Sequence, residues 1–504
     1  MARIARSMAC GGLAGRLFAG AALLVVGSVG MLGCASGGSA AAPASRITID
    51  GDVGDWPADV VVTGDADWVY LRFRVAGQAS TLQAAPETLS ILLDADDNRA
   101  TGAPIPELPA ASSMGIDLEI QFSPMTDAGV PASGVSAIAI DATGATERLS
   151  HADLDFHFSP TFAASATGWY EARIARRPTG SGLLAPTVLQ GRGIRGVMGL
   201  YDAAGNIAGA SEPFRATLPP AGSGAVVSSA PIPATPRGAI RVVSHNVLRA
   251  SPASNPGAFA RMYRALNPDI ILVQEWDTDA AAVRAWFDEA MPEHAPWHVA
   301  MTPGLFGVGI VSRHPISAST ADGTLAARTL AIGSSSVRFV AAVVSTPQGD
   351  VLAASTHLKC CGSAGSPEDE RRLDEARAIN AAFGAMATRS LAFRVIGGDM
   401  NLVGSRGPLD VLRNGLDADA TDMDVAPALV LGDAAYYTWS DDGSPFSPGR
   451  LDYVIFSDSQ ARAARAFVVD TERLTDGALG AVGLRRDDSR ASDHMPVVVD
   501  LLRR

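Results

Sequence analysis

The stretch Val395-Ile396-Gly397-Gly398-Asp399-Met400-Asn401 decides the fold of the larger part of this chain. An apolar run ends there in two glycines, and an Asp and an Asn follow, two positions apart. This pattern predicts a buried strand that stops at a tight turn and presents two polar side chains at its carboxyl end. In layered α/β folds that end of a strand is where ligands bind. A carboxylate there can take a proton from water, and an amide beside it can hold a phosphate oxygen.

Five other predicted strand segments carry polar side chains, in a fixed order around this stretch. They span residues 241–246, 270–275, 352–357, 449–456 and 492–496, the last one entering a terminal strand at 497–501. Their polar residues are, in order, Asn246, Gln274 with Glu275, His357, Asp452, and Ser492-Asp493-His494. A single Asp or Asn at a strand end is usually a turn cap, and a single His is usually structural. An ordered set of this kind is hard to obtain from caps, so it indicates one functional site.

Composition sets the outer limits of the interpretation. The chain has 504 residues, 47% hydrophobic and 18% charged, which predicts two or three domains with sizeable cores and excludes global disorder. Its formal net charge of -13 provides no overall attraction for nucleic acid or for an anionic membrane.

The N-terminus has the pattern of an export signal. Arg3, Arg6 and Arg16 flank an apolar run at 17–32, which is short for a membrane-spanning helix. The run ends in Met31-Leu32-Gly33-Cys34, which resembles a bacterial lipobox. The resemblance implies a signal peptide at 1–33, a lipid on Cys34, and anchoring in the outer membrane or at the cell surface. The alternative is ordinary secretion of a released protein.

The four cysteines do not form a disulfide framework. Cys10 leaves with the signal and Cys34 would carry the lipid, so only Cys360 and Cys361 remain in the folded part. This adjacent pair follows the His357 strand and would lie at the rim of the site. It could form a vicinal disulfide or bind a soft metal, or it could be a pair of inert thiols.

A flexible spacer at 34–45 leads to a predicted all-β sandwich at 46–216. Strand-like runs at 47–49, 68–75, 89–93, 116–122 and 168–174 are separated by Gly, Pro and Asp, without a long helical pattern between them. The opening at 49–57 resembles secreted bacterial domains similar to family-nine carbohydrate-binding modules and DOMON-like folds. Polysaccharide is therefore a possible ligand of this domain, although Trp56, Trp68 and Trp169 could all be core residues.

A loop of the predicted sandwich has the oxygen ligands that calcium prefers. These are Asp94, Asp96 and Asn98, with Asp117 on the strand after the loop. Oxygen ligands at alternate positions, closed by a Gly turn, suit a hard cation such as Ca²⁺. The alternative is a polar turn between strands.

The texture of the sequence changes after a Pro-, Gly- and Ser-rich linker at 217–238. From 239 to 504 short apolar strands alternate with helical patterns at 259–266, 279–290 and 368–387. This alternation predicts one large α/β domain.

The domain at 239–504 resembles the endonuclease/exonuclease/phosphatase superfamily. The resemblance rests on the ordered polar segments, on a run at 309–316 that is similar to a family strand, and on Thr438-Trp439 ahead of Arg450-Leu451-Asp452. It implies a four-layer α/β sandwich, in which two packed sheets are flanked by helices. Abasic-site endonucleases of this group carry an Asp where this chain has Leu248, so a role in DNA repair is not expected.

The same resemblance implies a role for each polar residue. Glu275 would be the main ligand of a Mg²⁺ or Mn²⁺ ion, with Asn246 and Asp493 close to the metal. Asp399 would orient or deprotonate the attacking water, with Asn401 beside it.

Two histidines complete the implied site. His494 would stabilise the developing charge on the phosphate, held by Asp452 as its carboxylate partner. His357 would contact the phosphate from the other side. Attack by water and charge neutralisation by the metal need no covalent intermediate.

The sequence therefore predicts an exported, metal-dependent hydrolase of phosphodiesters, and we expect a monomer. Nucleic acid, phospholipid head groups and small phosphodiesters all stay open as substrates. The alternative is a surface protein that binds polysaccharide and carries a catalytically inactive phosphatase-like domain.

Overall fold

The computed structural model describes residues 47–75, 82–126, 129–160, 168–178, 188–222, 227–249, 251–302, 304–317, 330–387 and 390–504. The predicted signal peptide, the spacer and Cys34 lie outside these residues. Within the described part of the chain, no helix combines the length and the apolar character needed to span a membrane.

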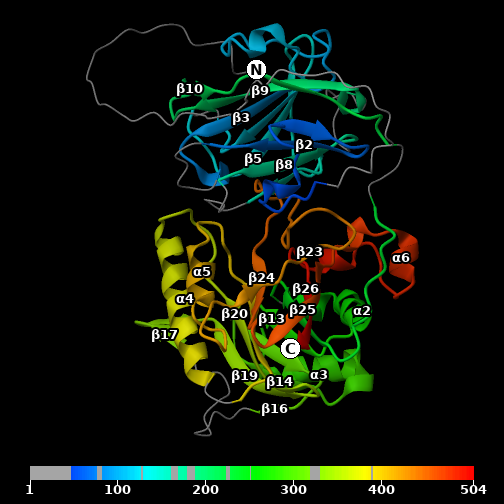
Figure 1. Cartoon of the computed structure of the whole chain (residues 1–504), viewed down its shortest axis with the longest axis vertical. Helices are drawn as coiled ribbons and strands as arrows, with labels where there is room; N and C mark the ends of the chain where they lie inside the picture. The colour runs from blue at the N-terminus through cyan, green and yellow to red at the C-terminus, as the bar shows by residue number, and fades with distance from the viewer. Residues whose placement is uncertain are drawn as a thin grey trace.

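The N-terminal part is a sandwich of two antiparallel sheets (Figure 1). The first sheet has the order β1 (Val62–Gly64), β2 (Trp68–Phe73), β8 (Tyr170–Ala175), β7 (His157–Ser159). The second has the order β10 (Ile207–Ala210), β9 (Gly193–Tyr201), β3 (Thr88–Asp94), β4 (Leu118–Phe122), β5 (Val135–Ile140), β6 (Thr146–Leu149), with β11 (Phe214–Thr217) also paired to β9. Inward-facing aromatic rings fill the space between the sheets, with Phe73, Phe122 and Phe158 in mutual contact. The predicted sandwich is confirmed.

Two details of the sandwich differ from or qualify the sequence interpretation. Residues 47–49 do not form a sandwich strand, because Ile49 makes an isolated bridge to Ala435 of the larger domain. Trp56 and Trp68 are 7% and 0% exposed, so neither ring is available to stack on a sugar.

The larger domain is built on two mixed sheets. The first has the order β14 (His298–Met301), β15 (Gly309–Ser312), β13 (Ile270–Gln274), β12 (Ile240–Asn246), β26 (Val497–Arg503), β25 (Ala461–Val468), β23 (Leu429–Val430). The second has the order β16 (Ile316–Ser317), β19 (Phe339–Thr346), β20 (Gly349–His357), β21 (Phe393–Asp399), β24 (Asp452–Phe456), β22 (Asp424–Val425). A short hairpin, β17 (Leu330–Ile332) with β18 (Ser335–Val337), stands apart from both sheets.

Helices cover the outer face of each sheet, which gives four layers (Figure 1). The helices are α1 (Ser251–Ser254), α2 (Pro256–Leu266), α3 (Ala280–Ala290), α4 (Pro367–Met386), α5 (Gly407–Arg413) and α6 (Asp476–Gly480). One buried cluster joins the two sheets, a second joins the first sheet to α2 and α3, and a third joins the second sheet to α4 and α5. The predicted four-layer α/β sandwich is confirmed. The predicted helix starts at 279 and 368 lie one residue from the observed ones, since Asp279 and Ser366 cap the first turns.

The two glycines that end β21 are required by close packing. A Cβ on Gly397 would lie 2.7 Å from Leu272 of β13 in the facing sheet. A Cβ on Gly398 would lie 1.9 Å from the carbonyl oxygen of Thr356 on the neighbouring strand β20. Glycine at these two positions therefore lets β21 pack closely against both the neighbouring strand β20 and the facing sheet. This placement brings Asp399, the next residue, to the edge of the sheet.

The sandwich and the larger domain share a buried, charged interface. The Arg173 guanidinium donates to both carboxylate oxygens of Asp433, at 2.6 and 2.7 Å, with side chains 0% and 4% exposed. Arg473 of the larger domain pairs in turn with Asp155 of the sandwich, beside His157. A buried bidentate pair is costly to break because each lone partner would be left as an uncompensated charge. The interface therefore holds the two domains in a defined arrangement.

The segment 217–238 is divided between the domains: Leu218 and Gly222 pack on the sandwich, whereas residues from Ser228 onward pack on the larger domain. Ser228 makes an isolated bridge with Leu474, and Ile232 is buried in a core cluster of that domain. The carbonyl oxygen of Pro233 accepts a hydrogen bond from Arg241 at 2.7 Å.

Candidate active site

The carboxyl ends of β12, β13, β20 and β21 and the amino end of the antiparallel strand β24 meet at one edge of the two packed sheets. On the second sheet His357, Asp399 and Asp452 are direct neighbours across β20, β21 and β24. On the first sheet Asn246 pairs with Gln274, and Glu275 follows directly. Register within each sheet, together with the packing of the two sheets, gathers residues that are far apart in the sequence.

Asp399 is the residue on which the site converges. It is 2% exposed, and its Oδ2 accepts a hydrogen bond from the Asn246 amide at 3.1 Å. The Nε2 atoms of His357 and His494 lie 3.5 and 3.7 Å from the same oxygen. Burial raises the pKa of Asp399 to about 7, against the lowering effect of His494. A carboxylate in this condition can accept a proton near neutral pH.

His494 is held by a carboxylate behind it. Its Nδ1 donates to Asp452 Oδ2 at 2.7 Å, and Asp452 is itself fixed by the Thr438 hydroxyl, which accepts from its backbone N–H at 2.9 Å. Burial disfavours a charged imidazole, but the carboxylates of Asp452 and Asp399 outweigh this effect and raise the pKa of His494 to about 10. His494 is therefore a cation at neutral pH, with Nε2 facing Asp399.

His357 has the opposite environment. Its Nδ1 lies 3.1 Å from Nη1 of Arg338, which can only donate, so Nδ1 accepts and the ring proton sits on Nε2. Burial, with Arg338 as the next cause, places the pKa of His357 well below its usual value. His357 is therefore a neutral hydrogen-bond donor whose Nε2 lies 3.6 Å from Glu275.

Glu275 sits in a left-handed backbone conformation with φ of +59°, directly after β13. Non-glycine residues adopt this conformation rarely, and such strain clusters at functional sites. Asn246 bridges the two sides of the site, because its amide nitrogen donates to Glu275 at 3.2 Å and to Asp399. Its oxygen accepts from the backbone of Leu248 at 3.1 Å. Burial raises the pKa of Glu275 as well.

Asp493 and Asn401 complete the set predicted from the sequence. Asp493 Oδ2 accepts from the Trp439 indole at 3.0 Å, whereas its buried Oδ1 has no hydrogen-bond partner. Asn401, with φ of +47°, donates its backbone N–H to Asp399 and its amide to the carbonyl of Leu358. Asn401 thus fixes Asp399 through the turn after β21.

The site fits a divalent cation. Glu275 and Asp399 offer carboxylate oxygens within 4.8 Å of one another, as do Asp399 and Asp452, whereas His357 and His494 keep a proton on Nε2. Burial raises the pKa values of Glu275 and Asp399, and a buried oxygen of Asp493 has no hydrogen-bond partner among the described residues, so a bound cation would stabilise the charged carboxylates.

The predicted calcium loop also gathers its acidic residues. Asp94, Asp96 and Asp117 offer oxygens within 4.8 Å of one another, and Asn98 donates its backbone N–H to Asp94 and Asp96. Arg195 pairs with Asp94 at 2.8 Å, so part of the negative charge is already neutralised. Calcium at this loop stays a prediction.

The adjacent cysteines lie in the loop after His357 as free thiols, with their sulfur atoms 2.8 Å apart. Cys361 has φ of +72° and is exposed. Arg372 holds the backbone of this loop, because its guanidinium donates hydrogen bonds to the carbonyl oxygens of Lys359 and Cys361.

Two residues near the site were not anticipated from the sequence. Arg338 stands just before β19 and reaches His357 only because Phe339 pairs with Thr356. The Phe306 ring lies 6.3 Å from the His357 ring, with Arg249 stacked over it at 4.4 Å. The apolar run after Arg338 indicates a strand, but nothing local indicates its partner.

Comparison with known proteins supplies a family. The sequence pattern of the Endonuclease/Exonuclease/phosphatase family matches residues 243–494, which is half of the chain. A Bacteroides thetaiotaomicron mannosyl-6-phosphatase is 15% identical with a TM-score of 0.37, over 52% of this chain and 99% of that chain. A Neisseria 3′ phosphatase bound to a product DNA hairpin is 19% identical with a TM-score of 0.36, over 52% of this chain and 98% of that chain.

A third solved structure, an endonuclease/exonuclease/phosphatase from Bacteroides vulgatus, is 14% identical with a TM-score of 0.35, over 53% of this chain and 99% of that chain. No curated protein matches the chain significantly.

Proposed function

The chain belongs to the endonuclease/exonuclease/phosphatase family, and from this membership we propose that it is an exported phosphodiesterase that depends on a divalent metal ion. Proteins of this family are hydrolases of phosphoester bonds. One observation carries the proposal for this chain: Asp399 lies between a cationic and a neutral histidine, next to Glu275.

Glu275 would be the main metal ligand, with Asp493 and Asn246 close to the ion. The metal, Mg²⁺ or Mn²⁺, would supply Lewis-acid neutralisation of charge on the phosphate oxygens. The raised pKa of Glu275 and the unpaired Asp493 oxygen support this assignment.

The protein's own groups divide the remaining work. Asp399 would take a proton from the attacking water, which its raised pKa favours. His494, kept charged by Asp452, would stabilise the negative charge that develops on the phosphate. His357 would donate a hydrogen bond from Nε2 to another phosphate oxygen, since Arg338 keeps Nδ1 without a proton.

The rim supports a diester rather than a bare phosphate. Leu305 is 71% and Leu248 39% exposed, and the Phe306 ring with its stacked Arg249 lies beside His357. Exposed apolar and aromatic groups at this place can contact a substituent on the second ester oxygen. Retention of Glu275, Asp399 and His494, in two clusters that share Asp399, does not favour the alternative of an inactive, polysaccharide-binding protein.

Export rests on the sequence of residues 1–34, and we propose that Cys34 anchors the protein in the outer membrane through a lipid. Labelling of the chain by a fatty acid in cells should be lost in Cys34→Ala. A chain that is still labelled, or never labelled, would exclude this anchor.

The activity test is hydrolysis of bis(p-nitrophenyl) phosphate in Mg²⁺, in Mn²⁺ and in EDTA. We expect turnover that needs metal and is lost in His494→Ala. A folded protein without turnover under all three conditions would exclude a general phosphodiesterase. A panel of phosphomonoesters would then identify a narrower phosphatase.

A further inference from the structure

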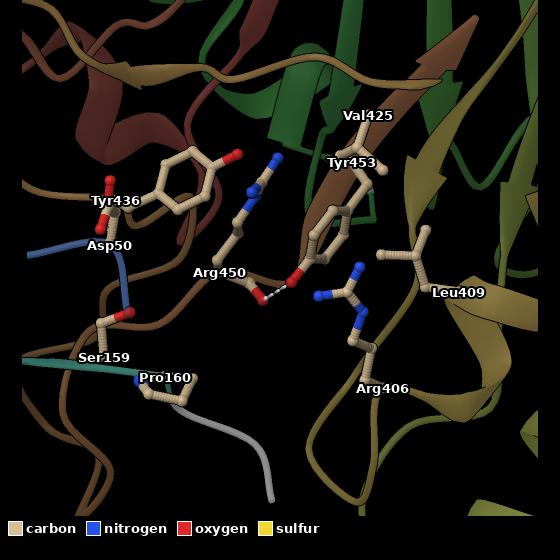
Figure 2. Close-up of a pocket in the computed structure, with 9 residues that line it drawn as sticks. All are labelled: Asp50, Ser159, Pro160, Arg406, Leu409, Val425, Tyr436, Arg450 and Tyr453. Atoms are coloured by element: carbon tan, nitrogen blue, oxygen red, sulfur yellow. Dashed lines mark hydrogen bonds between the residues drawn. The ribbon is translucent and has the colours of Figure 1, made fainter. Parts of the chain in front are cut away.

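A cavity of about 210 Å³ lies between the sandwich and the larger domain (Figure 2). The sandwich contributes Asp50, Ser159 and Pro160 to its wall. The larger domain contributes two arginines, two tyrosines and two apolar residues, namely Arg406, Arg450, Tyr436, Tyr453, Leu409 and Val425. The cavity is distinct from the strand ends that hold Glu275, and none of its lining residues belongs to the catalytic set.

Arg450 is the unusual residue of this wall. Its side chain is 9% exposed, and its guanidinium lies 3.5 Å from the Tyr436 ring centre and 4.2 Å from that of Tyr453. Within the part of the chain that the structure describes, the guanidinium makes one hydrogen bond, to the carbonyl of Ala426 at 3.1 Å, and its buried Nε has no partner there. Among the described residues, no carboxylate lies within ion-pair distance of it.

A buried guanidinium without a counter-ion is expensive. Burial lowers the pKa of Arg450 to about 10, which reports the cost of keeping the charge there. Stacking on two tyrosine rings offsets part of this cost but satisfies no N–H donor. An anion in the cavity would supply both the missing charge and an acceptor.

A second guanidinium is available on the same wall. Arg406 and Arg450 lie on either side of the Tyr453 ring (Figure 2). Arg406 is 40% exposed and pairs with Asp410 one helical turn away, a surface pair that contributes little and can be exchanged for a ligand. Two guanidiniums around one small cavity suit an oxyanion, because each can donate two parallel hydrogen bonds.

The sandwich side of the cavity adds a hydrogen-bond acceptor. Asp50 is partly buried, and burial raises the pKa of its carboxyl. Asp50 and the Ser159 hydroxyl can bind hydroxyl groups of a ligand whose anionic end faces the arginines. The apolar groups of Pro160, Leu409 and Val425 leave room for a short carbon skeleton.

We propose that this interdomain cavity binds a small hydroxylated oxyanion, carrying a phosphate or a carboxylate, at the wall that Arg450 and Arg406 share. Its occupant would contact both domains and so oppose their separation. The cavity wall is also continuous in sequence with the candidate active site, since Arg450 precedes Asp452 by two residues and Arg406 follows Asn401 by five.

The test measures binding to the full chain without turnover. All samples carry His494→Ala and contain EDTA, so that neither the cationic histidine nor a metal can hold the probe at the candidate active site. Inorganic phosphate and L-malate are titrated separately by calorimetry, and chloride serves as the control anion. The two probes distinguish a phosphate ligand from a carboxylate ligand.

Two matched arginine variants decide the location. Arg406→Gln should weaken binding about tenfold, as expected for loss of one charge-assisted contact. Arg377→Gln should leave it unchanged, since Arg377 is 62% exposed on α4 and pairs with Asp374 in the same way. Binding of either probe with this pattern supports the proposal.

The proposal would be overturned by no saturable binding of either probe, or by equal affinity in Arg406→Gln and in its parent. Equal weakening in Arg377→Gln would show a general charge effect and would overturn it too. A thermal melt provides a second readout, because a bound anion raises the melting temperature of the parent and not that of Arg406→Gln. These results do not depend on whether the chain hydrolyses phosphodiesters.

Discussion

Two histidines lie beside Asp399, and they have different charge states: His494 is a cation and His357 is neutral. His494 and His357 are 5% and 3% exposed, and their Nε2 atoms lie 3.7 and 3.5 Å from the same carboxylate oxygen. The Nδ1 partner differs: it is Asp452 for His494 and Arg338 for His357. The pKa of His494 is raised to about 10, whereas that of His357 lies well below its usual value.

This difference shows that the group bonded to Nδ1, rather than burial, makes the charge states of the two histidines differ. Burial disfavours the imidazolium at both places. At His494 the carboxylates of Asp452 and Asp399 reverse this effect of burial. The site therefore has one cationic and one neutral histidine beside Asp399, the carboxylate that we propose activates water.

The largest expected effect comes from removing the residue that both histidines face. Asp399→Ala should lower turnover of bis(p-nitrophenyl) phosphate by about 10³-fold or more, because the proton acceptor is lost. The fold should persist, since the side chain ends a strand and is not part of an apolar cluster. Asp374→Ala, on the exposed face of α4, is the control and should retain full activity. Equal turnover in the two variants would remove Asp399 from the reaction.

The next effect breaks the charged side. Asp452→Asn should lower turnover by roughly 10²- to 10³-fold, since the amide cannot hold His494 as a cation that stabilises the transition state. Asp410→Asn changes an exposed carboxylate of α5 in the same way and is the matched control. Activity of Asp452→Asn at the parental level would mean that His494 does not act through its charge.

Much of this site could be predicted from the sequence, because its residues stand at the ends of apolar strands. Asp399, His357 and Asn246 each follow such a run, and the runs correspond to β21, β20 and β12. Strand ends of this kind meet at one sheet edge, so their convergence follows from the fold class alone.

The asymmetry between the histidines could not be predicted. Arg338 meets His357 through the antiparallel register of β19 and β20, which no local pattern specifies. The contact of Ile49 with Ala435 is hidden for the same reason, since the two residues belong to different domains. Burial and charge partners depend on such long-range pairings, and pKa values follow from them.

A third buried histidine, His157 at the domain interface, extends the comparison, because its pKa affects the stability of the fold. His157 lies 2.9 Å from Asp155, yet burial, with Arg173 as the next cause, lowers its pKa to about 4. The unfolded chain therefore binds a proton at His157 below about pH 6.5 that the folded chain does not bind until about pH 4. The free energy of unfolding should fall by about 3 kcal/mol as pH decreases through this window.

Urea unfolding between pH 7 and about pH 4 measures this loss. The depressed pKa of Asp155 adds a loss in the same direction, but only at lower pH, as the pH falls through its folded value. In His157→Gln the slope inside the window should flatten. An unchanged slope in that variant would assign the acid sensitivity to other groups.

The smallest expected effect on turnover comes from a substitution that gives His357 the same kind of partner as His494. Arg338→Glu places a carboxylate near Nδ1 of His357, so the pKa of His357 should rise, as Asp452 raises that of His494. Nitrogen NMR of the histidine rings would follow this titration, with Arg371→Glu on α4 as a control that changes the same charge. Turnover should fall only about tenfold, since His357 keeps a proton on Nε2 in either state. If the His357 resonances titrate as in the parent, burial alone keeps that ring neutral. Arg338 would then act by contacting the substrate and not by setting the charge of His357.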